Sequence, residues 1–273
     1  MDTKLIVWSK DRACQLHLLL ESLETLSLSK NDQLDIEVIY RASNESFNDA
    51  YKKVNSIFGK VTFSEEAFFQ KDTQSALNTD HQNIAFSTDD TVCFKTFSLD
   101  GLSLNEGDVF SLRLGLNTLI QDPYKGMVQT PLNRYSKGIL GGIPTISWNP
   151  LDYHPSSNYG YPGGLDLHIF NRKKIQGILG GRPFKNTNEL EAILVGARLY
   201  FSSITSFKNS VAVNIPCNNM SGITQSGEVY SYSTQYLNDL YLKGFKVNLS
   251  RIMSENFVGC HQEVKFNMVK CNG

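Results

Sequence analysis

The sequence lacks several features that would narrow its function at once. Its cysteines are few and scattered: Cys14, Cys93, Cys217, Cys260 and Cys271. They form no C-x-x-C pair, which argues against a structural zinc site and against a disulfide framework. No stretch approaches 18 consecutive apolar residues, so no membrane-spanning helix is predicted. The first residues enter a strand-like run directly, without the apolar stretch of a signal peptide, and we therefore expect a cytoplasmic protein.

Glycine-rich phosphate motifs are missing as well. Neither G-x-G-x-x-G nor G-x-x-x-x-G-K-[ST] occurs anywhere in the chain, which argues against a dinucleotide-binding dehydrogenase and a P-loop ATPase. The 26 Lys and Arg residues nearly balance the 27 Asp and Glu residues, giving a net charge of −1. The whole chain therefore has no electrostatic attraction to nucleic acid, although local contact with a membrane surface stays compatible with this balance.

The chain is long enough to bury a core, and in its first half short strand-like apolar runs alternate with apolar residues at helical spacing. It has 273 residues, of which 41% are apolar and 19% are charged. Short apolar runs are followed by leucines at helical spacing, and such repeated β-α-β units predict an α/β fold with a mostly parallel sheet. The predicted strands cover residues 5–8, 36–40, 61–63 and 84–87, and the predicted helices cover 16–26, 47–58, with Ser46 as N-cap, and 72–77.

The second half of the sequence is less regular. Gly, Pro, Tyr and Asn are frequent between residues 127 and 164, which predicts loops with short antiparallel strands. Asn188 and Glu191 have the spacing of a capping box and predict the start of a helix. The other predicted elements are helices at 107–120, 171–179 and 234–242, the last with Ser233 as N-cap, and a strand at 167–170.

The most specific chemical signal is an acidic pair at the end of a predicted buried strand. Asp89 and Asp90 directly follow residues 84–88. The carboxyl ends of strands in open α/β sheets form the crevice where ligands bind. A hard divalent cation that is bound there by only one or two carboxylates has coordination positions left for phosphate oxygens. The alternative is that the two aspartates begin a solvated turn, where Asp is a preferred residue.

Motifs along nearly the whole chain resemble one family in their order. Residues 4–12, followed by a leucine-rich helix, resemble the opening of GT-A-fold glycosyltransferases, and residues 38–43 resemble the second strand and loop of one bacterial group of them. Residues 86–92 then match the metal-binding aspartate region. Further motifs in similar order lie at 164–170, 186–191, 213–216 and 261–263. Two departures are Ser87-Thr88 before the aspartates and Cys217 after Pro216.

The resemblance implies a fold, a domain layout and a cofactor. We expect a GT-A-like, mostly parallel sheet flanked by helices, in one domain over residues 1–273. Residues 1–125 would form the nucleotide-sugar half and 126–273 an elaborated acceptor-side half. Asp90 is then expected to hold Mn²⁺ or Mg²⁺, with His261 as a further protein ligand. For His261 the alternative is an ordinary surface or core histidine.

Donor-binding residues are implied by the same resemblance. Asp89 is expected to face the ribose or the donor sugar. Lys10, Arg12 and Arg41, at the ends of the first two strands, are expected to contact the nucleotide or its phosphates, or else to be solvated charges. The remaining expected donor-binding residues are Ser9 and Asp72.

An inverting transfer also needs a carboxylate that deprotonates the acceptor hydroxyl. Glu191 is the first candidate for this base, since inverting GT-A enzymes place the base near the start of a late helix. Its alternative role is the capping box. Glu189 and Asp166 are the other candidates. Aromatic side chains in the same region could stack on a sugar: Trp148, Tyr153, Tyr159 and Tyr161.

These expectations define one leading function and two alternatives. The leading function is a metal-dependent, inverting glycosyltransferase that moves a sugar from a UDP- or GDP-sugar to a glycan or lipid-linked acceptor. The first alternative is a non-catalytic carbohydrate- or nucleotide-binding protein on a degenerate GT-A scaffold. The second is a nucleotidyltransferase, for which the glycine-free sequence at residues 9–13 lacks the usual activation loop. The intact acidic pair favours an enzyme.

Overall fold

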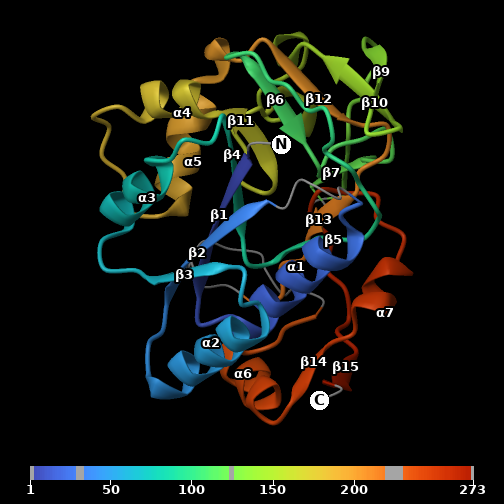
Figure 1. Cartoon of the computed structure of the whole chain (residues 1–273). Helices are drawn as coiled ribbons and strands as arrows, with labels where there is room; N and C mark the ends of the chain where they lie inside the picture. The colour runs from blue at the N-terminus through green and yellow to red at the C-terminus, as the bar shows by residue number, and fades with distance from the viewer. Residues whose placement is uncertain (1–2, 29–33, 123–125, 219–229, 272–273) are drawn as a thin grey trace.

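Strands and helices alternate through the first part of the chain (Figure 1). The computed structural model describes residues 3–28, 34–122, 126–218 and 230–271. The elements of this part are β1 (Thr3–Lys10), α1 (Ala13–Leu26), β2 (Asp35–Arg41), α2 (Glu45–Ile57), β3 (Thr62–Glu65), α3 (Phe69–Leu77) and β4 (Asn83–Thr88). The strands predicted at 5–8, 36–40, 61–63 and 84–87 are thus confirmed, with small differences at their ends.

The rest of the chain contributes shorter elements. The strands are β5 (Thr91–Cys93), β6 (Asp108–Ser111), β7 (Ile120–Asp122), β8 (Met127–Val128), β9 (Ser136–Leu140), β10 (Ile143–Trp148), β11 (His168–Asn171), β12 (Ser203–Phe207), β13 (Ala212–Asn214), β14 (Phe245–Val247) and β15 (Met268–Lys270). The helices are α4 (Arg172–Leu179), α5 (Thr187–Gly196), α6 (Thr234–Leu242) and α7 (Leu249–Met253). The helices predicted at 171–179 and 234–242, and the cap at Ser233, are confirmed.

A nine-stranded sheet joins the two parts of the chain. Its strand order is β3-β2-β1-β4-β11-β6-β12-β10-β9. All of these strands run in one direction except β11 and β10, which pair antiparallel with both of their neighbours. The predicted fold class, an α/β protein with a mostly parallel sheet, is confirmed. The carboxyl ends of β1, β2, β3 and β4 consequently lie along one edge of the sheet.

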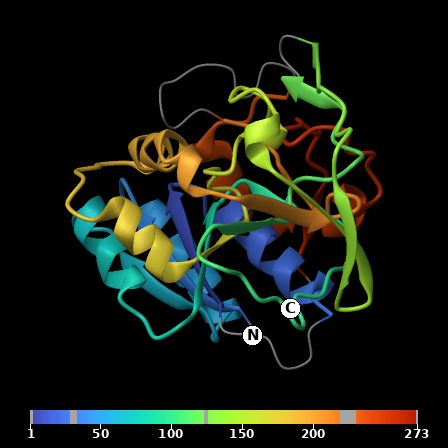
Figure 2. The same ribbon diagram turned by 90° about the horizontal axis from the view of Figure 1, so that it is seen from above.

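Apolar side chains of β1 alternate between two cores, one on each face of the sheet. Leu5 and Val7 pack into the core covered by α1, α2, α6 and α7. Ile6 and Trp8 pack into the core covered by α3, α4 and α5. Viewed from above, helices lie on both sides of the sheet (Figure 2). A strand buried on both faces reads as a continuous apolar run, which is why the sequence identified β1 correctly.

The helix predicted at 107–120 is wrong. Residues 108–111 form strand β6, and the chain continues through bends and turns. Val109 packs in one core and Phe110 in the other, which is the two-residue alternation of a strand inside a sheet. Gly115 also lies against the backbone, because an added Cβ would stand 2.2 Å from the amide nitrogen of Ser210.

Two predicted helix caps are displaced by two residues. Helix α2 is capped by Asn44, whose side chain accepts a hydrogen bond from the backbone of Phe47, and not by Ser46. Helix α5 is capped by Asn186, whose Oδ1 accepts from the Glu189 amide at 2.8 Å, and not by Asn188. Since an Asn side chain can satisfy the free amides of a first turn from either position, spacing alone left the start ambiguous. Glu191 therefore takes no part in a capping box.

The corrected cap of α5 gives a stability prediction with a matched control. Asn186→Ala removes the acceptor of the Glu189 amide and should cost about 1 kcal/mol of unfolding free energy. Asn188→Ala, inside the first turn of the same helix, should cost no more than about 0.5 kcal/mol. Chemical denaturation of both variants measures the difference, and an equal loss in the two would contradict the assignment of the cap.

All five cysteines carry free thiols. Within residues 3–28, 34–122, 126–218 and 230–271, no helix combines the length and apolar character needed to cross a bilayer.

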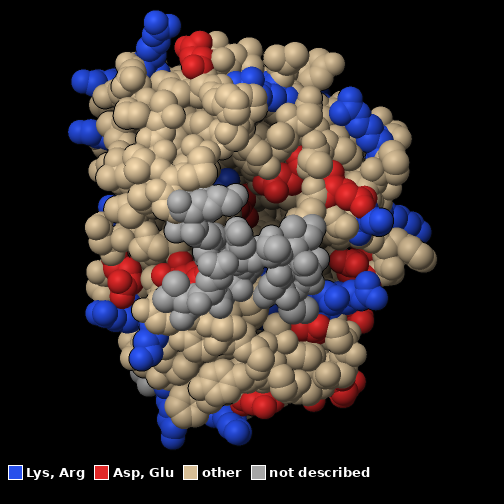
Figure 3. Space-filling model, turned by 180° about the vertical axis from the view of Figure 1, so that it is seen from behind, with Lys and Arg blue, Asp and Glu red and all other residues tan. Residues whose placement is uncertain are grey.

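On the face shown in Figure 3, Asp and Glu side chains gather around a central hollow, while Lys and Arg side chains are scattered toward the periphery.

Candidate active site

A cleft of about 460 Å³ opens where the parallel strands end. It extends along the carboxyl ends of β4, β1, β2 and β3 and is closed on one side by the start of α5. The cleft is lined by Trp8, Ser9, Lys10, Arg12, Arg41, Glu66, Phe69, Thr88, Asp89, Asp90, Lys185, Asn186, Thr187, Asn188 and Asn214. Five of the residues expected to bind the donor, together with the expected metal ligand Asp90, thus lie in one cavity.

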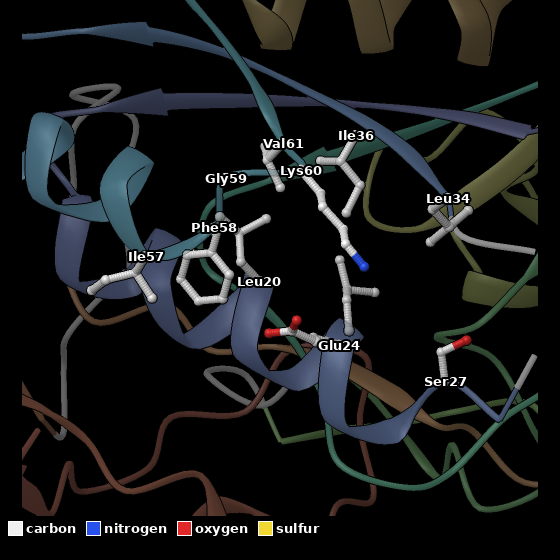
Figure 4. Close-up of a pocket in the computed structure, with 11 residues that line it drawn as sticks. Leu20, Glu24, Ser27, Leu34, Ile36, Ile57, Phe58, Gly59, Lys60 and Val61 are labelled. Carbon is white, nitrogen blue, oxygen red and sulfur yellow. The ribbon is translucent and has the colours of Figure 1, made fainter. Parts of the chain in front are cut away.

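A second hollow of about 410 Å³ lies between α1, α2 and the starts of β2 and β3 (Figure 4). Its wall is mainly apolar, with Leu20, Ile36, Ile57 and Phe58 pointing into it, and it shares no lining residue with the cleft. None of the expected site residues lies there.

The two aspartates of the acidic pair have different surroundings. Asp89 is 2% exposed, and its two carboxylate oxygens accept from Ser9 Oγ at 2.8 Å and from Arg12 Nη1 at 3.0 Å. Burial raises the pKa of Asp89 to about 6, although the Arg12 guanidinium opposes that shift. Both oxygens of Asp89 are therefore committed to the protein, and its side chain fixes Arg12 beside the cleft.

Arg12 links the two carboxylates. Its Nη1 also lies 3.2 Å from Asp90 Oδ2, and its Nη2 donates to the backbone carbonyl of Asn218. Burial alone lowers the pKa of Arg12, but the neighbouring Asp89 and Asp90 outweigh burial and raise it, so the guanidinium stays charged. One fixed cation thus partly neutralises the acidic pair.

Asp90 is held on several sides and still faces the cleft. Its Oδ1 lies 2.7 Å from the Thr88 hydroxyl and accepts from Asn214 Nδ2 at 2.8 Å. With the Arg12 bond, three of about four acceptor positions of this carboxylate are used. The remaining position suits one bond to a hard cation. Asp90 therefore fits a divalent metal as a single protein ligand, with the other positions left for phosphate oxygens and water.

His261 is connected to Asp90 through Asn214. The ring Nδ1 of His261 lies 3.2 Å from Asn214 Oδ1, and Nε2 lies 3.0 Å from Arg113 Nη1. Because a guanidinium only donates, this pairing assigns the lone pair to Nε2 and the proton to Nδ1. A metal could take His261 as a ligand only by replacing Arg113 at Nε2. Among the described residues, no group of three or more His, Cys, Asp or Glu side chains is arranged to hold a metal.

Arg113 forms a buried ion pair with Asp166. Arg113 is 4% exposed, and its Nη1 lies 2.8 Å from Asp166 Oδ2. Asp166 Oδ1 lies 2.9 Å from the hydroxyl of Thr88, the same hydroxyl that contacts Asp90. Burial alone raises the pKa of Asp166, but Arg113, His261 and the Thr88 hydroxyl together outweigh burial and lower it. Asp166 is therefore an ionised carboxylate at neutral pH. An added Cβ at Gly164 would stand 2.8 Å from Arg113 Nη2 and disturb the pair.

Glu191 has the opposite electrostatic character. Burial and the nearby Asp166 carboxylate raise the pKa of Glu191 to about 7, against the lowering effects of Arg113, the Leu165 amide and the Tyr161 hydroxyl. The hydroxyl of Tyr161 hydrogen-bonds to Glu191, and burial raises the pKa of Tyr161, so this hydroxyl remains a donor. Glu191 can therefore exchange a proton near neutral pH.

The other candidates occupy different parts of the molecule. Lys10 and Arg41 line the cleft. Asp72 does not line it, because its Oδ2 accepts from the backbone amides of Ala67 and Phe68 at 2.7 Å each and caps the start of α3. Glu189 lies at the start of α5, where its carboxylate accepts from the Lys185 amide at 3.0 Å.

Two of the aromatic residues expected to stack on a sugar are structural. Trp148 is buried and its Nε1 donates to the carbonyl of Tyr159 at 2.8 Å. The Tyr159 hydroxyl donates to the carbonyl of Gly115 at 2.9 Å. Tyr161 instead lies beside Glu191.

Two contributors to the site were not predicted from the sequence. Arg113 stands between Leu112 and Leu114 in the run whose spacing predicts a helix at 107–120, and a cation among apolar residues is the one sequence signal for it. Asp11 has a left-handed backbone (φ 56°) and is 4% exposed. Its Oδ1 accepts from the Ser43 amide at 2.7 Å, which ties the loop after β2 to the end of β1.

The start of α5 adds positive potential to the cleft. Asn186, Thr187 and Asn188 line it together with Lys185. The free amides in the first turn of a helix and its macrodipole favour negative charge. The start of α5 thus attracts anions, and the acidic pair lines the same cleft, so a ligand with both a phosphate and a bound cation matches both features.

The architecture and the cleft can be compared with those of known proteins. An α/β sheet that presents an acidic pair to a cleft at the carboxyl ends of its parallel strands is the arrangement that the sequence resemblance to GT-A-fold glycosyltransferases predicts. The sequence is 27% identical over 194 residues to the bifunctional glycosyltransferase pgtA of Dictyostelium discoideum. The match covers 65% of this chain and 25% of that protein, so this chain spans about a quarter of its curated relative. The predicted resemblance to glycosyltransferases is confirmed.

No protein-family model matches the chain. Among solved structures, residues 1–349 of TarS from S. aureus are 15% identical, with a TM-score of 0.46 over 78% of this chain and 59% of that one. The mannosyltransferase PcManGT from Pyrobaculum calidifontis, in complex with GDP-Man and Mn²⁺, is 11% identical, with a TM-score of 0.41 over 70% of this chain and 50% of that one.

Proposed function

We propose that this chain is a metal-assisted, inverting glycosyltransferase that moves a sugar from a nucleotide-diphosphate donor to a hydroxyl of a glycan or lipid-linked acceptor. The observation that carries the proposal is the divergence of two neighbouring carboxyl groups. Arg113 keeps Asp166 ionised, whereas burial raises the pKa of Glu191 to about 7. Neighbouring titratable groups with pKa values driven apart are typical of acid–base sites.

In this proposal the donor diphosphate lies between Asp90 and the start of α5. A divalent cation bound by Asp90 would neutralise the diphosphate as a leaving group. Arg12 holds Asp90 in place, and Lys185 and the first turn of α5 favour the negative charge of the phosphates. Asn214 fixes the other oxygen of Asp90 and connects it to His261.

Glu191 is the proposed general base. Its carboxylate takes the proton of the acceptor hydroxyl as the hydroxyl oxygen attacks the anomeric carbon, and the bond from that carbon to the diphosphate breaks. With a pKa of about 7, a substantial fraction of Glu191 is ionised at neutral pH and can accept this proton. Tyr161 orients the carboxylate, and the fixed charge of Asp166 makes it more basic. Because Glu191 acts as a base and not as a nucleophile in this proposal, the acceptor oxygen displaces the diphosphate in a single step, which inverts the configuration of the anomeric carbon.

The test is nucleotide release from a panel of UDP- and GDP-sugars, with and without an acceptor mixture, in Mn²⁺ or in EDTA. We expect one donor to release nucleoside diphosphate in Mn²⁺, faster with the acceptor, and much more slowly in EDTA. Tight, metal-dependent binding of a nucleotide sugar with no turnover under any acceptor condition would instead indicate the binding-protein alternative.

A further inference from the structure

The cleft extends well beyond the acidic pair, toward the outer strands of the sheet. Because β4, β1, β2 and β3 are consecutive neighbours, three strand spacings separate Asp90 from Glu66, about 14 Å in all. Both residues line the same cavity. If the diphosphate lies at Asp90, as in the proposed function on which this inference rests, the nucleoside extends toward Arg41 and Glu66.

Glu66 has acceptor capacity that the described residues do not use. Its backbone amide donates to the carbonyl of Tyr40 at 2.7 Å, which holds it beside the end of β2. Its side chain is 19% exposed and forms an ion pair with Arg41, whose Nη1 lies 3.7 Å from Oε1, beyond hydrogen-bond distance. Within the described part of the chain, no donor makes a hydrogen bond to this carboxylate. Desolvation raises the pKa of Glu66, while Arg41 lowers it.

The cavity wall also has an aromatic part, formed by the half-buried Phe69 and by Trp8, which is 5% exposed and stacked on Phe86. Trp8 and Phe69 both line the cavity, and their ring centroids lie 5.7 Å apart at an interplanar angle of 30°. Trp8 is fixed by its Nε1, which lies 3.2 Å from Thr73 Oγ1. A nucleobase packed against such rings presents its edge, and not its face, to polar groups at the rim.

A carboxylate beside a guanidinium distinguishes among nucleobase edges. Guanine presents two adjacent donors, N1–H and the 2-amino group, which match the two oxygens of one carboxylate, and two acceptors, O6 and N7, which match an arginine. Adenine and cytosine place a donor next to an acceptor on the corresponding Watson–Crick edge, so they do not match two carboxylate oxygens. Uracil offers one N–H between two carbonyl oxygens, so it can donate to only one of the two carboxylate oxygens.

We propose that the donor of this enzyme is a guanosine diphosphate sugar, and that Glu66 determines this specificity by accepting from N1–H and the 2-amino group of guanine. Arg41 then binds the O6 and N7 edge. Its side chain is 61% exposed and can turn toward a ligand.

Calorimetric titration of the whole chain with GDP, IDP and UDP in Mn²⁺ tests this proposal. IDP differs from GDP only in lacking the 2-amino group. Since a hydrogen bond to a charged group contributes about a tenfold or larger factor, the wild type should bind GDP at least about tenfold more tightly than IDP, and more tightly than UDP. In Glu66→Gln the ratio of GDP to IDP affinity should fall to about one, because one amide oxygen no longer matches two donors. The matched control is Glu65→Gln, on the exposed neighbouring residue, which should keep the wild-type ratio.

Tighter binding of UDP than of GDP by the wild type would overturn this proposal, and so would an unchanged GDP-to-IDP ratio in Glu66→Gln. Transfer from a UDP-sugar would overturn it too, while leaving the proposed glycosyltransferase function intact. The wild-type comparison of GDP with IDP needs no variant, so it holds even if Glu66→Gln folds poorly.

Discussion

Glu191→Gln should lower the turnover number about 10²–10⁴-fold and leave donor affinity within about twofold of the wild type. The amide keeps the shape of the side chain and its contact with Tyr161, but it cannot accept the acceptor's proton, and losing a general base typically has an effect of this size. Initial rates of sugar transfer, together with calorimetric titration of the nucleoside diphosphate, measure both quantities. Glu189→Gln is the matched control, since Glu189 lies two residues away at the start of the same helix and should retain nearly full activity.

The pH dependence of the same variant supplies an independent check. Wild-type turnover should rise with pH through about 7, because the base must be ionised. Stability should change in the opposite direction: the folded pKa of Glu191 lies above its ordinary value of 4.5, so the folded state binds more protons between pH 4.5 and 7, and stability falls as pH rises through that window. The Gln side chain of Glu191→Gln does not titrate, so this variant does not lose stability in that window. Between pH 4.5 and pH 8, its unfolding free energy should therefore rise by about 1–3 kcal/mol relative to that of the wild type. A fully active variant, or one with no pH-dependent gain, would contradict the assignment.

Asp90→Asn should abolish the metal dependence of nucleotide binding. The amide offers one neutral oxygen in place of a carboxylate, so the tightening of GDP or UDP binding by Mn²⁺ should shrink by at least about 10–100-fold. Titration in Mn²⁺ and in EDTA gives this ratio directly. Asp72→Asn is the control, because Asp72 caps α3 outside the cleft. An Asp90→Asn protein with the wild-type Mn²⁺ effect would exclude Asp90 as the ligand.

The same titration decides the role of His261. If Nε2 of His261 releases Arg113 and binds the cation instead, His261→Ala should lose metal affinity to nearly the same extent as Asp90→Asn. If it only links Arg113 to Asn214, metal affinity should stay near the wild type.

Local periodicity was enough to predict the central strands and the cleft at their carboxyl ends. The strands β1, β2 and β4 lie inside the sheet, so their apolar runs are nearly unbroken, and the acidic pair that follows β4 lines the cleft. The helix predicted at 107–120 failed because Val109, Leu112 and Leu116 match a helical period by chance, while pairing of β6 with β11 and β12 decides its structure. Such long-range pairing leaves no signal in a local window.

The connections within the site were less accessible to sequence reasoning. Arg113 reaches Asp166 across 53 positions and His261 across 148. A single arginine between leucines gives no indication of such partners. Likewise, spacing could not separate Asn186 from Asn188 as the cap, and that difference of two residues frees Glu191 from the capping box and leaves it available for proton transfer.

The backbone of Asp11 has a consequence for how a donor would bind. A left-handed conformation costs a non-glycine residue about 1–2 kcal/mol, and the bonds of Asp11 to Ser43, with its amide 3.1 Å from the Arg41 carbonyl, offset that strain. The ends of β1 and β2, which carry Lys10, Arg12 and Arg41, are thereby ordered before any ligand arrives. This floor of the cleft is preorganised, so a nucleotide that enters it loses its own freedom of motion while the protein beneath it loses little conformational entropy.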